Sequence, residues 1–335
     1  MLWAALALLG AVLDAGYYAL AKRFLPSLED EVLAAGGFLA ASALLFVASL
    51  LRGIPAVAPD LLLPVLVTGT INIIAALLVF HALRRTDLSL AVPMITFTLV
   101  FLMGSSYLVL GEIPTAAGIT GILLIVAGAL VMQVRSGGSD PGPVPDGDAG
   151  QGKVSRPPDD GSGSSAEAPA PVKSVAVFPG TFLRRITRDR GVLIMLLVSF
   201  LYSLSLPFDK AVVLASDAFF GSALVCLYVG GVLAGIALFR GSGRRTIPSA
   251  ALTAALSIGL VLAGETIAIN LAYTFQIVPY VIAVKRLSIL FSVFIGGLVF
   301  REGGLRFRVP GALVMLGGVA LIVLATIPGP WPLPQ

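Results

Sequence analysis

Long apolar runs separated by short polar segments make up most of the chain. A transmembrane helix needs about 20 mostly apolar residues, and the sequence holds ten runs of roughly that length with little or no charge. The runs are 2–22, 32–51, 61–83, 88–111 and 114–134 in the first half, and 191–213, 218–239, 248–275, 279–300 and 310–327 in the second. This pattern predicts an all-α polytopic membrane protein with ten transmembrane helices.

One long segment between the fifth and sixth runs departs from the pattern. Residues 136–175 are rich in Gly, Pro, Ser and Asp and contain no aromatic residue and no apolar period. Such a composition cannot bury enough apolar surface to offset its ordering entropy. The predicted organisation is a first five-helix unit at 1–134, a disordered linker at 135–190, a second unit at 191–328 and a short tail at 329–335.

Composition supports the membrane assignment and excludes several functions. Hydrophobic residues make up 57% of the chain and charged residues 12%, against roughly 25% charged in soluble domains. The net charge of +4 suits an anionic membrane surface better than nucleic acid. The sequence has no Cys/His cluster, no Walker A loop and no catalytic elbow, so it predicts no metal, no cofactor and no enzyme. We expect a multi-pass protein of the inner, or plasma, membrane.

The two halves are related by an internal repeat. A shift of 190 residues superimposes the last two runs of each half without a gap. The informative matches are Glu112 with Glu302, Gly121 with Gly311, and Gly128 with Gly318. Each glutamate closes a helix, and the glycines allow the next helix to pack closely. Gly231 and Gly235 form another small-residue pair of this kind within 218–239.

An odd number of helices in each unit forces the second copy into the membrane upside down. Inverted repeats of this kind are the architecture of many secondary transporters, which bind substrate near mid-membrane between the repeats. The predicted fold is therefore two inverted five-helix repeats.

Several motifs resemble a known transporter family. The first half carries the segment from Arg84 to Pro93, then Leu110-Gly111-Glu112, then Gly121 and Gly128. The second half carries the segment from Val284 to Ser292, then Phe300-Arg301-Glu302, then Gly311 and Gly318. These segments resemble the EamA-type repeat of the drug/metabolite transporter superfamily, over nearly the whole chain outside the linker.

The resemblance implies a ten-helix bundle around a central cavity. Helices 1, 3, 4, 6, 8 and 9 would line much of that cavity, and helices 5 and 10 would be peripheral. Members of the superfamily move amino acids, sugars, nucleotide sugars, cations or drugs by alternating access. The partner implied here is a small solute, with a proton as a candidate coupling ion and a homodimer as one alternative for the oligomeric state.

Positive charge in short loops predicts the orientation. Arginine and lysine concentrate on the side of the linker, as at Arg84, Arg85, Arg184 and Arg185. The charge rule therefore predicts a cytoplasmic linker and both chain ends outside, whereas the resemblance favours cytoplasmic chain ends. We follow the charges.

Ionisable residues inside apolar runs are functional candidates by default. Glu265 and Asn270 lie in the eighth run, and Lys285 lies in the ninth, which is antiparallel to it across a short turn. Counting from that turn at about 1.5 Å per residue brings Lys285 within reach of both. Lys285 is a candidate ligand for an anionic substrate group, and Glu265 is a candidate proton- or cation-binding carboxylate. The alternative is a buried pair that only holds two helices together.

Four further residues are weaker candidates for substrate or coupling contacts. Asp14 lies in the middle of the first run and has Lys22 as an alternative partner. Asn72 in the third run is also suited to hydrogen bonding between helices. Tyr202 precedes Pro207 and has the alternative role of bonding backbone groups freed by that proline. Arg286 has the alternative of reaching to the membrane interface.

Three functions remain open at this point. The inverted repeat favours a secondary transporter for a metabolite or drug-like solute. A membrane-embedded enzyme acting on a lipid would need clustered catalytic groups at one membrane face, and a non-transporting scaffold would lack a polar interior.

Overall fold

The described part of the chain is entirely helical. A computed structural model describes residues 1–24, 29–83, 95–134, 190–241, 249–291 and 305–327, and every regular element in these ranges is a helix. The helices are α1 (Leu2–Phe24), α2 (Asp30–Arg52), α3 (Leu62–Leu83), α5 (Thr98–Leu110), α6 (Ala116–Val134), α8 (Arg190–Ala215), α9 (Phe220–Phe239), α10 (Ser249–Tyr273), α11 (Val278–Lys285) and α13 (Leu305–Ala325). The predicted all-helical fold is therefore confirmed over these residues.

The described helices fall on the predicted apolar runs. Helices α1, α2, α8, α9 and α10 are long and apolar enough to cross a membrane, and α3, α5, α6 and α13 contain shorter apolar stretches. Helix α13 begins at Leu305, before the predicted start at Pro310, whereas α11 ends at Lys285, well before the end of the predicted run at 300. A proline near a helix start costs only one backbone hydrogen bond, so Pro310 does not prevent the helix from beginning before it.

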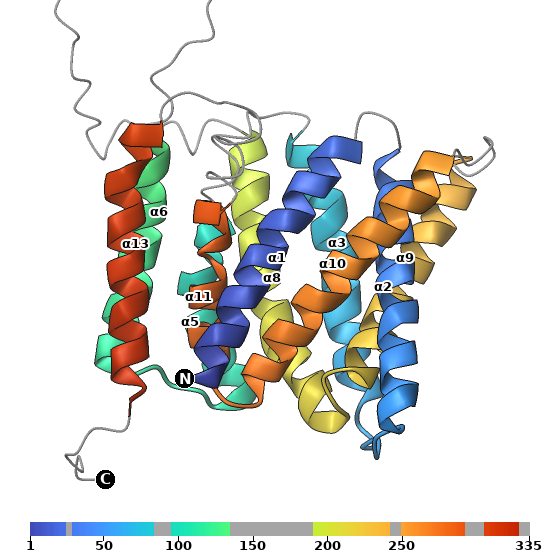
Figure 1. Cartoon of the computed structure of the whole chain (residues 1–335), viewed down its shortest axis with the longest axis horizontal. Coiled ribbons are helices and arrows are strands. Elements are labelled where there is room, and N and C mark those ends of the chain that lie inside the picture. The colour runs from blue at the N-terminus through green and yellow to red at the C-terminus, as the bar shows by residue number, and fades with distance from the viewer. Residues whose placement is uncertain (25–28, 84–94, 135–189, 242–248, 292–304, 328–335) are drawn as a thin grey trace, which may run out of the picture.

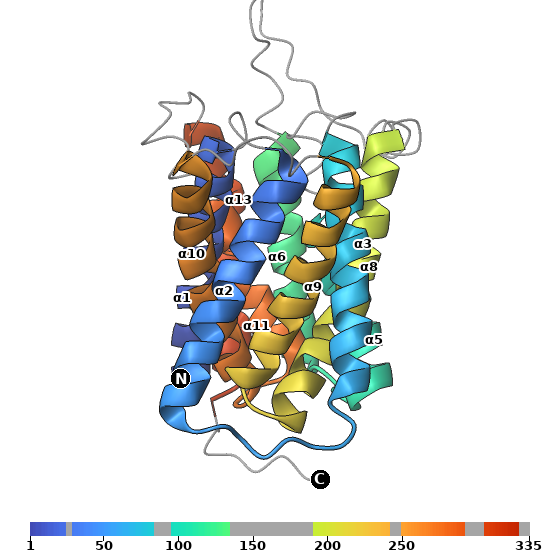
Figure 2. The same ribbon diagram turned by 90° about the vertical axis from the view of Figure 1, so that its right-hand side faces the viewer.

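The helices form an elongated bundle (Figure 1). Helices α6 and α13 pair at one end of the bundle, and α2 and α9 pair at the other. Between these ends, α1 packs against α10, and α3 packs against α8. Seen along the bundle in Figure 2, α1 and α10 lie on one side and α3, α5 and α8 on the other.

The distribution of side chains is that of a protein in lipid. Large apolar side chains face outward, and Leu51, Leu108 and Phe239 are 84%, 81% and 95% exposed. Polar side chains such as Thr68 and Ser199 are fully buried. Since apolar side chains gain by facing lipid and polar ones by facing each other, the bundle suits a bilayer.

Glycines bring α6 and α13 into close contact. A methyl group at Gly121 would lie 2.7 Å from the Gly318 carbonyl oxygen, and one at Gly128 would lie 2.6 Å from the Gly311 carbonyl oxygen. Only glycine permits this approach. The expectation for Gly231 and Gly235 was wrong, because no atom from another part of the structure lies within 4 Å of a methyl group at either position.

Two helical segments are interrupted at matching positions. The backbone turns at Arg286 and Leu287, after α11, and at Phe97, just before α5. Hydrogen bonds between residues three apart, rather than four, occur there. They run from the Leu287 amide to the Val284 carbonyl (3.0 Å) and from the Val100 amide to the Phe97 carbonyl (3.0 Å). The 190-residue shift carries Phe97 onto Leu287.

Candidate functional site

Three charged side chains meet inside the bundle and form what we call the charged centre: Asp14, Glu265 and Lys285. They come from the middle of α1, from α10 and from the last residue of α11. The Lys285 Nζ atom lies 2.5 Å from Glu265 Oε1 and 3.9 Å from Asp14 Oδ1. The side chains of Asp14, Glu265 and Lys285 are only 10%, 9% and 22% exposed. The centre holds two carboxylates for one lysine, and the Arg286 guanidinium lies within electrostatic range of Lys285.

Aromatic and cationic groups surround the charged centre. Tyr17, Tyr18 and Tyr202 lie close enough to interact electrostatically with its members. Arg286 interacts in the same way with Tyr18 and Tyr202. Among the described residues Arg286 forms no ion pair, and its buried Nε has no hydrogen-bond partner.

Asn270 lies apart from the charged centre. Its amide nitrogen donates to Ser222 Oγ on α9 at 2.6 Å. Five residues along a helix correspond to a rotation of about 140° beyond a full turn, so Asn270 and Glu265 face different neighbours. The depth count alone did not capture this rotation, and Asn270 makes a contact between helices.

A second polar cluster joins α3 to α8. Thr68 Oγ1 lies 2.6 Å from Ser205 Oγ and donates to Asp209 Oδ1 at 2.5 Å. The Asn72 amide nitrogen donates to Ser205 Oγ at 3.0 Å and to Thr68 Oγ1 at 3.2 Å. Asn72 therefore makes the hydrogen bond between helices for which its position in the third run is suited. Asp209 also interacts electrostatically with Lys285, which links this cluster to the charged centre.

A neighbouring helix supplies the backbone hydrogen bond that is missing at Pro207. Proline has no amide hydrogen, so the carbonyl of Ser203 loses its regular partner within α8. Ser105 Oγ on α5 donates to that carbonyl at 2.5 Å. Tyr202 is therefore not needed for this role and remains beside the charged centre.

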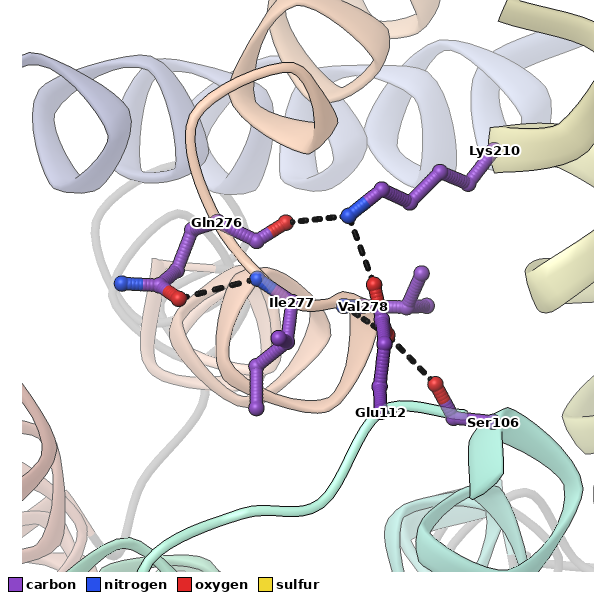
Figure 3. Close-up of polar contacts among 6 residues, drawn as sticks. All are labelled: Ser106, Glu112, Lys210, Gln276, Ile277 and Val278. Atoms are coloured by element: carbon purple, nitrogen blue, oxygen red, sulfur yellow. Dashed lines mark hydrogen bonds and ion pairs between the residues drawn. The ribbon is translucent and has the colours of Figure 1, made fainter. Parts of the chain in front are cut away.

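A second ion pair closes one end of the bundle (Figure 3). We call it the Glu112 junction, and it comprises Ser106, Glu112, Lys210, Gln276 and Val278. Glu112 Oε1 accepts from Lys210 Nζ at 2.6 Å, and Oε2 accepts from Ser106 Oγ at 2.5 Å and from the Val278 amide at 2.9 Å. Lys210 Nζ also donates to the Gln276 carbonyl at 2.9 Å. The junction ties the end of α5 to α8 and to the start of α11.

A cavity of about 470 Å³ lies at this junction. Its lining consists of Leu110, Glu112, Lys210, Leu214, Tyr273, Thr274, Phe275, Gln276 and Ile277. The Gln276 side-chain oxygen accepts from the Ile277 amide at 2.9 Å. Most hydrogen-bonding groups of the lining are thus already engaged with one another.

Sequence reasoning missed Asp209 and Lys210 as members of two different clusters. Although they are adjacent in the sequence, Asp209 accepts from Thr68 and Lys210 pairs with Glu112. Neighbouring residues on a helix point about 100° apart and do not face each other. That geometry was the available signal that the two charges must have separate partners. Glu302, the predicted counterpart of Glu112, lies outside the described residues.

Comparison with known proteins matches part of the sequence to a family. Residues 1–134 match the EamA-like transporter family. The family resemblance is thereby confirmed over this EamA-like segment. In the comparison with curated proteins, no sequence gives a significant match.

Solved structures share the fold of the whole chain. One, whose title reads "Crystal structure of protein", has a TM-score of 0.66 and 16% sequence identity, covering 96% of this chain and 96% of its own. At this identity the likeness concerns the fold alone. The EamA-like segment and the apolar helices identify a multi-pass membrane protein, as predicted.

Proposed function

We propose that this chain is a secondary transporter that moves a small metabolite or drug-like solute by alternating access between two inverted five-helix repeats. The observation that carries the proposal is the charged centre. Burying charged groups in a membrane protein is unfavourable unless they pair or serve a pathway. Here the pairing is incomplete, because Asp14 and Glu265 share one lysine.

Reciprocal contacts support the repeat. The 190-residue shift maps Gly121 onto Gly311 and Gly128 onto Gly318. The contact of Gly121 with Gly318 therefore maps onto the contact of Gly128 with Gly311. A two-fold relation between two units produces contacts of this reciprocal kind. The packing of α1 on α10 and of α3 on α8 has the same character, since each joins the first helix of one half to the third helix of the other.

Interrupted helices support a site at the same place. Transporters with inverted repeats commonly bind substrate where their helices are discontinuous. The turn at Arg286 and Leu287 directly follows Lys285, so the interruption in this helix adjoins the charged centre. Arg286 has no described carboxylate partner and is the cation left to meet an anionic group of a solute.

In this proposal Asp14 and Glu265 exchange a proton or bind a cationic group, with Lys285 holding them in place. This changes the role first expected of Lys285, because an ammonium already shared by two carboxylates is less free to bind an anion. Tyr202 lies beside this site. The Glu112 junction is the closed gate at one end, because it joins residues of both halves through side-chain contacts that can part.

We further propose that the Glu112 junction faces outward. It lies at the face where α1 begins and α13 ends, opposite the face where α6 ends and α8 begins (Figure 1). The positive residues near the helix ends favour a cytoplasmic location for the second face. Single cysteines at Ile54 and Glu29, placed on opposite faces in a Cys226→Ala background, test this orientation. Labelling of Glu29→Cys, rather than Ile54→Cys, by an impermeant maleimide in intact cells contradicts it.

Transport itself is tested with purified protein in liposomes. We expect at least one solute of a panel of metabolites and cationic or zwitterionic drugs to accumulate when a proton gradient is imposed. Abolition of accumulation by a protonophore supports coupling. A panel without any protein-dependent uptake, measured on protein with an intact melting transition, contradicts the proposal.

A further inference from the structure

The hydroxyl of Tyr273 is buried and unused. The residue is 1% exposed at the end of α10, and its oxygen has no hydrogen-bond partner among the described residues. The ring packs in the largest apolar cluster of the bundle, with neighbours such as Ile269 and Val278. A phenylalanine would fill the same space without burying an unsatisfied polar atom, which is unfavourable.

The position of Tyr273 lies between the two charged regions. It lines the cavity at the Glu112 junction together with Glu112 and Lys210. It also interacts electrostatically with Asp209, Glu265 and Arg286. Eight residues separate it from Glu265 on the same helix, which is roughly 12 Å. A solute that passes the junction toward the charged centre therefore meets Tyr273 on the way.

The chemistry of the cavity indicates the kind of group that would bind there. Glu112 and Lys210 neutralise each other at 2.6 Å, and the Gln276 carbonyl accepts from Lys210. Figure 3 shows the Gln276 amide nitrogen pointing away from the junction. Around these groups the lining is apolar, with Leu110, Leu214, Phe275 and Ile277. The Tyr273 side chain belongs to this lining, and its neutral phenol hydroxyl is buried beside it without a partner.

We propose that Tyr273 binds the solute at an intermediate station between the Glu112 junction and the charged centre, through a hydrogen bond to an uncharged polar group such as a carbonyl, an amide or a hydroxyl. This inference rests on the proposed transport function. The hydroxyl is unsatisfied while the junction is closed, and a solute entering past the opened junction gives it a partner.

Two Tyr→Phe variants separate this role from a structural one. Tyr273→Phe removes no hydrogen bond, so we expect a melting temperature equal to or above that of the unmodified protein. The KM for uptake should rise about 3- to 10-fold, the amount expected for one neutral hydrogen bond. Tyr280→Phe is the matched control, because its hydroxyl accepts from the Thr115 amide at 2.8 Å. The control should lower the melting temperature and leave KM unchanged. An unchanged KM for Tyr273→Phe overturns the inference.

A second measurement needs no transported solute. Tyr273→Cys in a Cys226→Ala background is treated with a small methanethiosulfonate reagent, with the junction intact and with Glu112→Gln and Lys210→Met combined. We expect at least tenfold faster labelling when the junction is broken. No labelling in either form of the folded protein overturns the inference. If labelling is faster as expected but the protein moves no solute, the transport function is contradicted. Access to Tyr273 through the opened junction is then still supported.

Discussion

Two glutamate–lysine pairs on the same molecule differ in what surrounds them. In the charged centre, Lys285 lies 2.5 Å from Glu265, and in the Glu112 junction, Lys210 lies 2.6 Å from Glu112. The side chains are similarly shielded, at 22% and 9% exposure in the centre and 13% and 10% in the junction. The distances and burial are therefore nearly the same, and the neighbours make the difference.

The neighbouring groups suggest different roles for the two glutamate–lysine pairs. The centre has a second carboxylate, Asp14, so two carboxylates share Lys285 inside the bundle. In the junction the charges balance, and backbone groups of the start of α11 complete the contacts of Glu112 and Lys210. Two carboxylates that share one lysine can exchange a proton or a cation, whereas a balanced pair bound to the backbone can hold two elements together or release them.

Removing both charges of the centre should have the largest effect on transport. Lys285→Met leaves two buried carboxylates without their lysine, which costs about 3–5 kcal/mol of stability, whereas Glu265→Gln leaves Lys285 paired with Asp14 and costs less. The double variant leaves Asp14 without Lys285, so it should regain only part of that stability, and it should have no measurable uptake. Melting temperature and liposome uptake are measured together on all three variants.

The control for this experiment is a surface pair of the same chemistry. Arg240 lies 2.5 Å from Glu31, and its side chain is 62% exposed. Exposed pairs contribute roughly 0–1 kcal/mol, so Glu31→Gln with Arg240→Met should change neither property. A double variant of the charged centre that is stable and transports normally would reduce the centre to a structural pair and remove the contrast with the junction.

Asp14→Asn tests the second carboxylate that distinguishes the two regions. Lys285 keeps Glu265 at 2.5 Å and loses only the partner at 3.9 Å, so we expect a small change in melting temperature. Uptake against a gradient should fall by roughly tenfold or more, equivalent to about 1.4 kcal/mol, while exchange of labelled for unlabelled solute continues. Equal loss of accumulation and exchange would show that Asp14 binds the solute itself rather than the coupling ion.

Sequence reasoning reached some of these contacts and not others for a geometric reason. The contact between Glu265 and Lys285 could be predicted because their helices follow each other across a short turn, which fixes their relative depth. Asp14 and the pair of Glu112 with Lys210 could not, because these contacts join helices far apart in the sequence. Their meeting depends on how whole units pack, and a count along one chain segment does not contain that information.

Rotation about the helix axis was the second missing quantity. Asn270 has the right depth to meet Lys285 and yet faces Ser222. Gly231 and Gly235 have the spacing of a packing motif and contact no other helix. Spacing and hydrophobicity predicted the helices well, whereas the face that each helix turns to its neighbours required the three-dimensional arrangement. The functional roles of the site residues stay predictions.

Opening the Glu112 junction should have a smaller effect on transport than changing the centre. The combined variant Glu112→Gln and Lys210→Met loses an ion pair that holds α5, α8 and α11 together. We expect uptake to change by less than tenfold, because the solute site is intact, and the closed state to lose about 1–3 kcal/mol. Thiol labelling of Leu110→Cys, which lines the cavity, should become faster. Complete loss of uptake with unchanged labelling would place the junction among the binding residues and erase the distinction between the regions.

The smallest expected effect concerns the α6–α13 contact, which belongs to neither region. If the two halves move as units, the α6–α13 contact must stay intact at its end of the bundle. The charged centre and the Glu112 junction then both depend on it. Gly128→Ala places a methyl group 2.6 Å from the Gly311 carbonyl and 2.8 Å from the Met315 amide nitrogen. Because these atoms belong to backbone and cannot rotate away, the helices must separate, at a cost of about 1–3 kcal/mol.

Gly231→Ala is the matched control, since its methyl group meets no atom within 4 Å and alanine favours a helix by up to about 1 kcal/mol. We expect Gly128→Ala to lower the melting temperature and to leave the KM for uptake unchanged. Gly231→Ala should lower neither the melting temperature nor the affinity for the solute. A raised KM in Gly128→Ala would mean that this contact sets the geometry of the charged centre directly, and the two regions could then no longer be treated as independent of the outer helix pair.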